Sequence, residues 1–185
     1  MAERICPVWV GYLLASPIRK LFENPKKLLS DHVISDMTIL DVGCAMGFFS
    51  IPLAKMVGSN GKIIAIDLQP KMIESLKKRA AKANVGERIE TRICESNNLN
   101  IDDLKDQIDF VLAYHMVHEV PNASELYQQL FRSLKPGGKL FVAEPKGHLK
   151  EIDFNQSVQL ANNVGFEIID RPKVWRGYSA LFQKS

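Results

Sequence analysis

The sequence lacks disulfide spacing, long apolar runs and an excess of charge of one sign. Its three cysteines, Cys6, Cys44 and Cys94, are far apart and form no CxxC pair, so neither a disulfide framework nor a cysteine zinc site is indicated. The apolar run at residues 8–15 is far short of the ~20 residues that span a bilayer. With 24 Lys and Arg against 21 Asp and Glu, the net charge of +3 does not indicate a nucleic-acid partner. We therefore expect a protein of the reducing cytosol, with no membrane span and no nucleic-acid partner.

Length and composition indicate an ordinary globular domain. The 185 residues fit a single domain, because domains commonly have ~100–200 residues. With 46% hydrophobic and 24% charged residues, the chain is not expected to be disordered. A chain of this length buries about 70% of the surface that its unfolded form exposes, so it needs no metal or disulfide to hold a core.

From residue 38 onward, segments typical of strands and helices alternate. We expect strands at residues 38–42, 62–66, 88–94, 108–113, 139–143, 166–170 and 178–183, and helices at 48–57, 70–83, 123–133 and 153–164. Alternation of this kind predicts parallel βαβ units in a doubly wound, Rossmann-like α/β sheet. Residues 171–177 are too few for a crossover helix, so the final strand should be antiparallel. Residues 1–37 are expected to form a helical cap of the same domain, outside the main unit at 38–185.

A glycine loop follows the first expected strand. Gly43 and Gly47 allow a tight turn and a close approach of the backbone to a ligand, and the following helix favours a negative group. Asp67 ends the second strand, where a carboxylate can accept hydrogen bonds from vicinal ribose hydroxyls, although it can also cap the helix from Pro70. Asp41 precedes the loop, and a buried carboxylate there suits a cationic group better than a pyrophosphate.

With these motifs the sequence resembles the class I S-adenosylmethionine (AdoMet)-dependent methyltransferases. The resemblance is carried by LDVGCAMG at residues 40–47, IAID at 64–67, DFVLA at 109–113 and LKPGGKL at 134–140. It covers residues 38–185, and the four motifs in this order are specific for the superfamily but say little about the substrate. The resemblance implies AdoMet as the cofactor.

The resemblance also implies roles for individual residues. Ala45 stands where the family usually has glycine, and its methyl group narrows the loop. The implied cofactor-binding residues are Asp41, Gly43, Ala45 and Gly47 at the methionine moiety, Asp67 at the ribose, Leu68, Glu95 and Ser96 at the adenine, and Tyr114 near the methyl group.

The segment after the fourth strand carries the candidate catalytic residues. If residues 115–119 are helical, His115, His118 and Glu119 share one face. One histidine would then act as a general base with Glu119 orienting it. Two other roles stay open. Quinone-pathway O-methyltransferases have a Glu-x-x-Glu-His pattern here that some use for a divalent ion, and this chain would suit Zn²⁺ or Fe²⁺ better than Mg²⁺; alternatively, the histidines serve packing and capping. No metal ligand is assigned. Glu144, at the end of the fifth strand, would orient a substrate or pair with Lys146.

The function predicted from these residues is methyl transfer from AdoMet to a small-molecule acceptor. Trp9, Tyr12 and Phe22 in the leading segment would either wall an apolar substrate pocket or pack on the outer helices. Arsenite methylation, which uses cysteine thiolates, is disfavoured because Cys44 lies in the cofactor loop and no cysteine cluster exists. The alternatives are a catalytically silent AdoMet-binding module and a nicotinamide-dependent dehydrogenase, against which the missing G-x-G-x-x-G spacing and the final antiparallel pair argue. The acceptor and the oligomeric state are not predicted.

Overall fold

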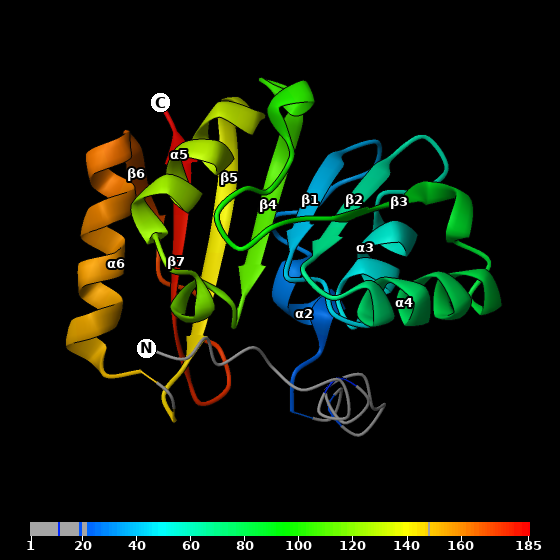
Figure 1. The fold of residues 1–185 in the computed structure, drawn as a ribbon, viewed down its shortest axis with the longest axis horizontal. Coiled ribbons are helices and arrows are strands. Elements are labelled where there is room, and N and C mark those ends of the chain that lie inside the picture. The colour runs from blue at the N-terminus through cyan, green and yellow to red at the C-terminus, as the bar shows by residue number, and fades with distance from the viewer. Residues whose placement is uncertain (1–10, 12–18, 20–21, 148) are drawn as a thin grey trace. The chain divides into compact units, whose positions relative to one another are not determined.

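A computed structural model describes residues 11, 19, 22–147 and 149–185 of the chain (Figure 1). The apolar run at 8–15, with Trp9 and Tyr12, lies almost wholly outside the described residues, and so does most of the expected cap. Phe22 is described, and its side chain is 57% exposed. The chain divides into two compact units, Met1–Cys94 and Glu95–Ser185. In the described residues, no helix has the length and apolar character needed to cross a membrane.

The first unit is built on three parallel strands. Their order is β3-β2-β1, and their bounds are Thr38–Val42 for β1, Lys62–Asp67 for β2 and Ile89–Ile93 for β3. Its helices are α2 (Pro25–Leu29), α3 (Ser50–Met56) and α4 (Pro70–Lys82), and a 3₁₀ turn, η2 (Gly86–Arg88), precedes β3. In β2 every residue after Lys62 is buried, which explains its β-branched, apolar composition.

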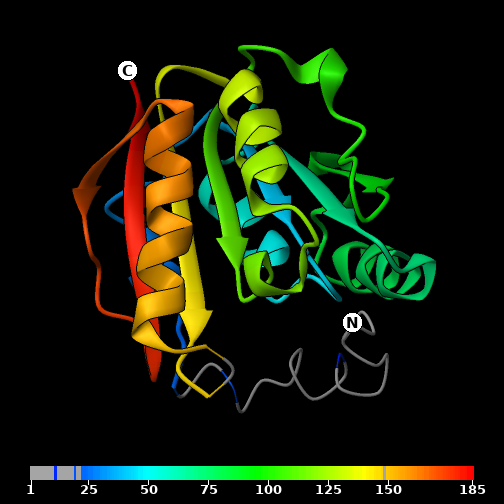
Figure 2. The same cartoon turned by 60° about the vertical axis from the view of Figure 1, so that its left-hand side comes forward.

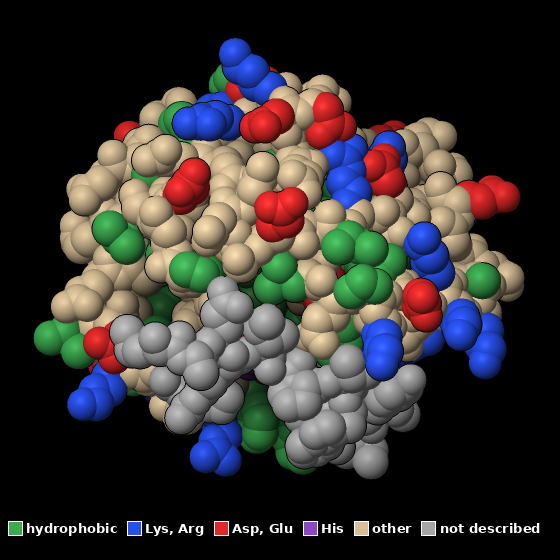
Figure 3. All heavy atoms as spheres, viewed as in Figure 1, with side chains coloured by type: hydrophobic (Ala, Val, Ile, Leu, Met, Phe, Trp, Pro, Cys, Tyr) green, Lys and Arg blue, Asp and Glu red, His purple; other side chains and the backbone are tan. Residues whose placement is uncertain are grey.

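The expected helix at residues 70–83 is confirmed as α4. Pro70 occupies its first turn, where the missing N–H costs nothing. Apolar residues at helical spacing form its buried face, with Met72, Ile73, Leu76 and Ala80 facing the unit. Figure 3 shows Lys and Arg side chains projecting around the position of α4 in Figure 1, and the exposed cations of this helix are Lys71, Lys77, Lys78 and Lys82.

The second unit contains a parallel pair followed by the antiparallel strand that the short connection predicted. Its strand order is β4-β5-β7-β6, with β4 at Ile108–Tyr114, β5 at Leu134–Pro145, β6 at Phe166–Asp170 and β7 at Gly177–Lys184. β5 runs parallel to β4 and antiparallel to β7, and β6 is also antiparallel to β7. Figure 2 shows α5 (Ala123–Ser133) and α6 (Glu151–Val164) side by side on one face of these strands. The unit also has 3₁₀ turns η3 (Asp102–Leu104) and η4 (Val117–Glu119).

Two expected boundaries are wrong for physical reasons. The expected strand at 139–143 begins earlier, at Leu134, because Leu134 pairs with Ile108 before a register irregularity. The LKPGG segment therefore opens β5 in addition to ending α5. The expected helix at 48–57 begins only at Ser50, so that Pro52 lies in its first turn, where proline is tolerated.

Candidate functional site

The loop between β1 and α3 is built on left-handed backbone conformations. Gly43, Ala45 and Gly47 have φ values of 69°, 46° and 80°. Glycine adopts these angles without strain, which explains why a loop of this kind favours glycine at such positions, whereas Ala45 adopts one as a non-glycine residue. The backbone N–H groups of Gly43 and Cys44 donate to the Ile66 carbonyl at 2.9 and 3.0 Å. These bonds tie the loop to the end of β2.

Asp67 at the end of β2 connects the loop to the start of α4. Its Oδ2 accepts a hydrogen bond from the Ala45 N–H at 2.9 Å, and its Oδ1 accepts one from the Gln69 N–H at 2.9 Å. Burial raises the pKa of Asp67, while hydrogen bonds from the backbone of Gln69, Ala45 and Leu68 lower it. The N-cap residue of α4 is Gln69. Asp67 is therefore not the N-cap itself, but it accepts the N–H of the N-cap residue.

The surroundings of Asp67 fit a ligand with vicinal hydroxyl groups. The two carboxylate oxygens have about four acceptor positions together, and the backbone N–H groups of Ala45, Gln69 and Leu68 are their three protein donors. At least one acceptor position is thus left for a hydroxyl donor. Leu68 is 36% exposed beside it, which offers an apolar surface for a base, and Gly43 is exposed. A nucleoside bearing two ribose hydroxyls, as in AdoMet, matches this combination.

Asp41 lies buried beneath the loop. The Ser50 hydroxyl donates to its Oδ2 at 2.5 Å. Burial, the largest effect, and the charge of Asp67 raise the pKa of Asp41 to about 7, although hydrogen bonds from the Ser50 side chain and backbone oppose them. The folded chain therefore binds this proton more tightly than the unfolded chain, so the stability contributed by the group is present at low pH and is lost as pH rises through 7. A cationic ligand near Asp41 would favour its ionised form.

The missing side chain of Gly47 lets the loop pack on α4. Gly47 is buried, and a Cβ on it would overlap Leu76 Cδ1 of α4. The predicted role of Gly47 at the methionine moiety of the cofactor stays a prediction, and packing is a second reason for glycine at this position.

We expect Gly47→Ala to lower the free energy of unfolding by about 2–4 kcal/mol, because overpacking adds to the cost of a left-handed alanine. Gly58→Ala is the matched control. Gly58 has a similar φ of 75°, and a Cβ there would meet nothing within 4 Å, so this variant reports backbone strain alone. Urea denaturation measures both variants. Equal losses of unfolding free energy in the two variants would show that the Leu76 side chain moves away from the new methyl group at no energetic cost.

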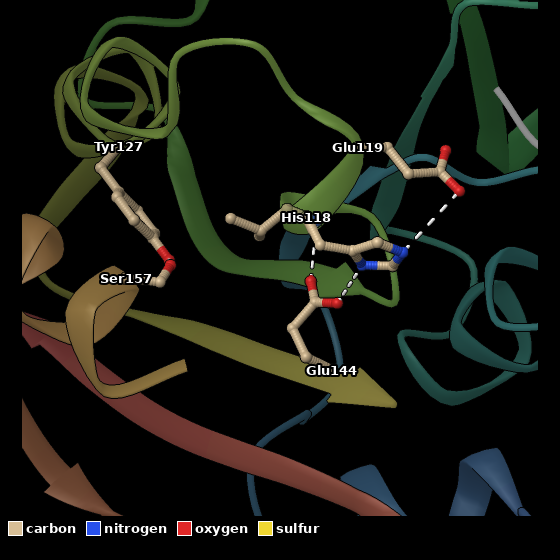
Figure 4. Close-up of polar contacts among 6 residues, drawn as sticks. His118, Glu119, Tyr127, Glu144 and Ser157 are labelled. Atoms are coloured by element: carbon tan, nitrogen blue, oxygen red, sulfur yellow. Dashed lines mark hydrogen bonds and ion pairs between the residues drawn. The ribbon is translucent and has the colours of Figure 1, made fainter. Parts of the chain in front are cut away.

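The second candidate constellation lies at the ends of β4 and β5, as Figure 4 shows. His118 Nδ1 is hydrogen-bonded to Glu144 Oε2, and Glu144 Oε1 accepts the Val117 N–H at 2.8 Å. Glu144 is only 1% exposed. Glu119 Oε1 lies 4.0 Å from His118 Nε2, on the other side of the ring. Glu144 therefore holds Nδ1, and Nε2 faces the more exposed Glu119.

The charge state of His118 follows from these neighbours. Burial lowers the pKa of His118, but the hydrogen bond and charge of Glu144, together with the charge of Glu119, outweigh burial and raise it above 6.5. The imidazole is thus a stronger base than an ordinary histidine. Its Nδ1–H, donated to Glu144, leaves Nε2 as the nitrogen that can take a proton.

The condition for His115, His118 and Glu119 to share one face, a helix across residues 115–119, is not met. Only the short turn η4 forms, and His115 has a φ of 60°, so the three polar side chains do not share a helical face. The His115 ring lies 4.3 Å from that of Tyr114, the buried last residue of β4. His118 Nδ1 is hydrogen-bonded to Glu144, while Glu119, the residue expected to orient the ring, lies 4.0 Å from Nε2. From the sequence, Glu144 was expected to orient a substrate or to pair with Lys146, although neighbouring parallel strands place their carboxyl ends together, a signal that could have indicated its contact with His118.

The second unit has three further polar residues of interest, which are Tyr127, Glu95 and Ser96. The Tyr127 hydroxyl is hydrogen-bonded to Ser157 Oγ at 2.7 Å between α5 and α6 (Figure 4), and burial raises the pKa of Tyr127 to about 12. Glu95 is exposed in a turn in which its N–H donates to the Asn98 carbonyl at 2.8 Å, and Ser96 is half-buried. Across the described ranges, no group of three or more His, Cys, Asp or Glu side chains is placed to hold a metal ion.

Comparison with known proteins shows the family of the chain. Residues 34–176 match the family model described as "Methyltransferase domain". An arsenite methyltransferase of Halobacterium salinarum is 30% identical over 65% of this chain and 30% of its own length. A demethylmenaquinone methyltransferase of Lactobacillus johnsonii is 30% identical over 57% of this chain and 42% of its own. The chain thus spans less than half the length of these curated relatives.

A solved structure shows the same fold. A SAM-dependent methyltransferase from Aquifex aeolicus superposes with a TM-score of 0.87 at 22% identity, covering 98% of this chain and 100% of that one. The family match extends over more than half of the sequence, so the chain belongs to the methyltransferase-domain family. The predicted α/β fold is confirmed, and the predicted cofactor, AdoMet, agrees with the family match and with the SAM named for the Aquifex aeolicus protein.

Proposed function

We propose that this chain transfers a methyl group from AdoMet to a small organic acceptor. The observation that carries the proposal is the Asp67 carboxylate, which the Ala45 and Gln69 amides hold in place while at least one acceptor position is left for a ligand hydroxyl. AdoMet would supply an electrophilic methyl group on a sulfonium centre, and the protein would bind, orient and exclude water.

Residues of the first unit would hold the cofactor. Asp67 would accept hydrogen bonds from the two ribose hydroxyls, with Leu68 beside the adenine. Gly43 and Ala45 would present backbone to the methionine moiety, and the ionised form of Asp41 would favour its positive charge. Glu95 and Ser96 at the adenine and Tyr114 near the methyl group stay predictions.

His118 would act on the acceptor as a general base, with Glu144 as its positioning residue. Glu144 accepts from the Val117 amide and from His118 Nδ1, which fixes both the carboxylate and the imidazole ring. Nε2 would then take the proton that the acceptor loses as its new bond to carbon forms. This pair favours an enzyme over a silent binding module, because cofactor binding alone needs no oriented base.

The acceptor class is argued from the relatives and from the cysteines. The names of the two curated relatives described above refer to arsenite and to demethylmenaquinone, which are both small molecules, whereas a third, of Arabidopsis thaliana, is named for protein L-isoaspartate. Arsenite chemistry needs thiolates. Cys44 is buried, and burial together with the nearby carboxylates Asp41 and Asp67 raises its pKa well above 9. We therefore favour an organic acceptor that has an ionisable proton.

Incubation with methyl-labelled AdoMet and a cell extract, split into small-molecule and macromolecular fractions, tests this proposal. Label is expected in an organic small molecule, with release of S-adenosylhomocysteine. Binding of AdoMet without transfer from any fraction would identify a silent module. Label confined to the macromolecular fraction would contradict the acceptor class while leaving methyl transfer intact.

A further inference from the structure

One end of the second unit combines cationic and apolar side chains on its surface. This end, called the basic end here, comprises the turn after β5, the start of α6 and the turn between β6 and β7. All of its cations are exposed, and they are Lys146, Lys150, Arg171, Lys173 and Arg176. Figure 3 shows Lys or Arg side chains projecting from the molecule at the lower left, below α6 and the β6–β7 turn of Figure 1.

Hydrogen bonds hold the three segments of the basic end together. The Lys146 N–H donates to the Arg176 carbonyl at 3.0 Å, which joins the end of β5 to the β6–β7 turn. The Arg171 guanidinium donates to Asn155 Oδ1 at 3.3 Å, which joins the end of β6 to α6. The cations therefore belong to one continuous surface rather than to separate loops.

Apolar side chains lie exposed among these cations. Trp175 is 51% exposed in the β6–β7 turn, and Ile152 is 64% exposed in the first turn of α6. The Arg176 guanidinium lies 5.7 Å from the Trp175 ring, so the aromatic and the charge are presented together. Exposed large apolar groups of this kind are typical of interaction surfaces.

The acidic side chains of the basic end are fewer and partly engaged. Asp153 accepts the Lys150 N–H at 3.3 Å, and Asp170 accepts the Arg171 N–H at 2.7 Å. Glu151 is exposed. Five cations against three carboxylates leave this surface positive, although the second unit as a whole has no excess of basic residues.

We propose that the basic end binds the surface of an anionic lipid bilayer. Tryptophan prefers the interface between headgroups and acyl chains, and neighbouring Lys and Arg side chains are attracted to anionic headgroups. A nucleic acid would match the cations and could stack a base on Trp175, but it would leave the aliphatic Ile152 without apolar contact, so a bilayer accounts for both halves of the surface. This surface binding requires no membrane span and does not depend on the proposed methyl transfer.

Co-flotation of the full-length protein with vesicles tests the proposal, and no AdoMet is present. We expect binding to phosphatidylglycerol-containing vesicles and a loss of binding in pure phosphatidylcholine or at high salt. In a Trp9→Phe background, Trp175 is the remaining tryptophan, and its fluorescence should shift to the blue on binding.

Matched substitutions separate the two halves of the surface. Trp175→Ala should weaken partitioning about tenfold, since it removes an apolar side chain from the interface. Ile93→Ala is the control, because Ile93 is equally exposed at 51% but lies on β3 of the first unit. Lys173→Glu with Arg176→Glu should weaken partitioning at least ~10-fold, whereas Lys77→Glu with Lys78→Glu on α4 should change it little.

Three results would overturn the proposal: no flotation with anionic vesicles at low salt, equal flotation with neutral vesicles, or equal losses in the control variants. Binding to duplex DNA or RNA without binding to vesicles would assign the surface to nucleic acid instead.

Discussion

His118→Ala is expected to lower kcat by ~10²–10⁴-fold, the usual contribution of a positioned general base. The expectation rests on Nδ1 being held by the buried Glu144, which leaves Nε2 to accept a proton. The affinity for AdoMet should hardly change, because the proposed ribose and methionine contacts lie on the β1 and β2 ends. Steady-state kinetics with the identified acceptor and calorimetry with AdoMet measure the two effects separately.

The pH profile distinguishes a base from a packing residue. Because Glu144 and Glu119 raise the pKa of His118 above 6.5, turnover should rise with pH through a value above 6.5. Glu144→Gln removes the charge but keeps the shape, so it should move that inflection to lower pH. The inflection should be absent in His118→Ala.

Two outcomes would contradict the role as a base. If His118→Ala unfolds at a lower temperature but keeps its turnover, His118 is a packing residue. If chelators abolish turnover and an added divalent ion restores it, the histidine serves a metal site instead.

Asp67→Ala is expected to weaken AdoMet binding by about 1.5–3 kcal/mol, roughly 10- to 150-fold in Kd, the usual range for hydrogen bonds to a charged group. The loss would come from the two hydroxyl contacts and from the Ala45 and Gln69 amides, which would lose their acceptor. Calorimetric titration with AdoMet measures it.

Asp67→Asn and Glu95→Ala are informative comparisons. The first keeps the size and one acceptor oxygen, so it should lose less affinity than Asp67→Ala. The second removes an exposed turn residue that the sequence resemblance placed at the adenine. Unchanged affinity in a folded Asp67→Ala variant would refute the ribose assignment.

Local sequence patterns predicted the first unit well. Short contiguous motifs predict the strands β1 and β2, the glycine loop and the acid Asp67. The helix α4 is indicated by Pro70 at its start and by apolar residues at helical spacing. Such features depend on neighbouring residues, so they can be recognised without knowing the tertiary structure.

Contacts between distant residues were not predicted. The pairing of His118 with Glu144 joins positions 26 apart through the alignment of β4 and β5, whereas the adjacent Glu119 was expected to orient the ring. The early start of β5 likewise depends on Leu134 pairing with Ile108. The packing role of Gly47 depends on Leu76, which belongs to another element.

An experimental structure of the protein with AdoMet bound tests the central claim most directly. We expect both ribose hydroxyls to be hydrogen-bonded to the Asp67 carboxylate. We also expect the adenine to lie against Leu68 and the methionine moiety to lie along the backbone from Gly43 to Ala45. A cofactor bound elsewhere, or Asp67 oxygens contacting only Ala45 and Gln69 while AdoMet is present, would contradict it.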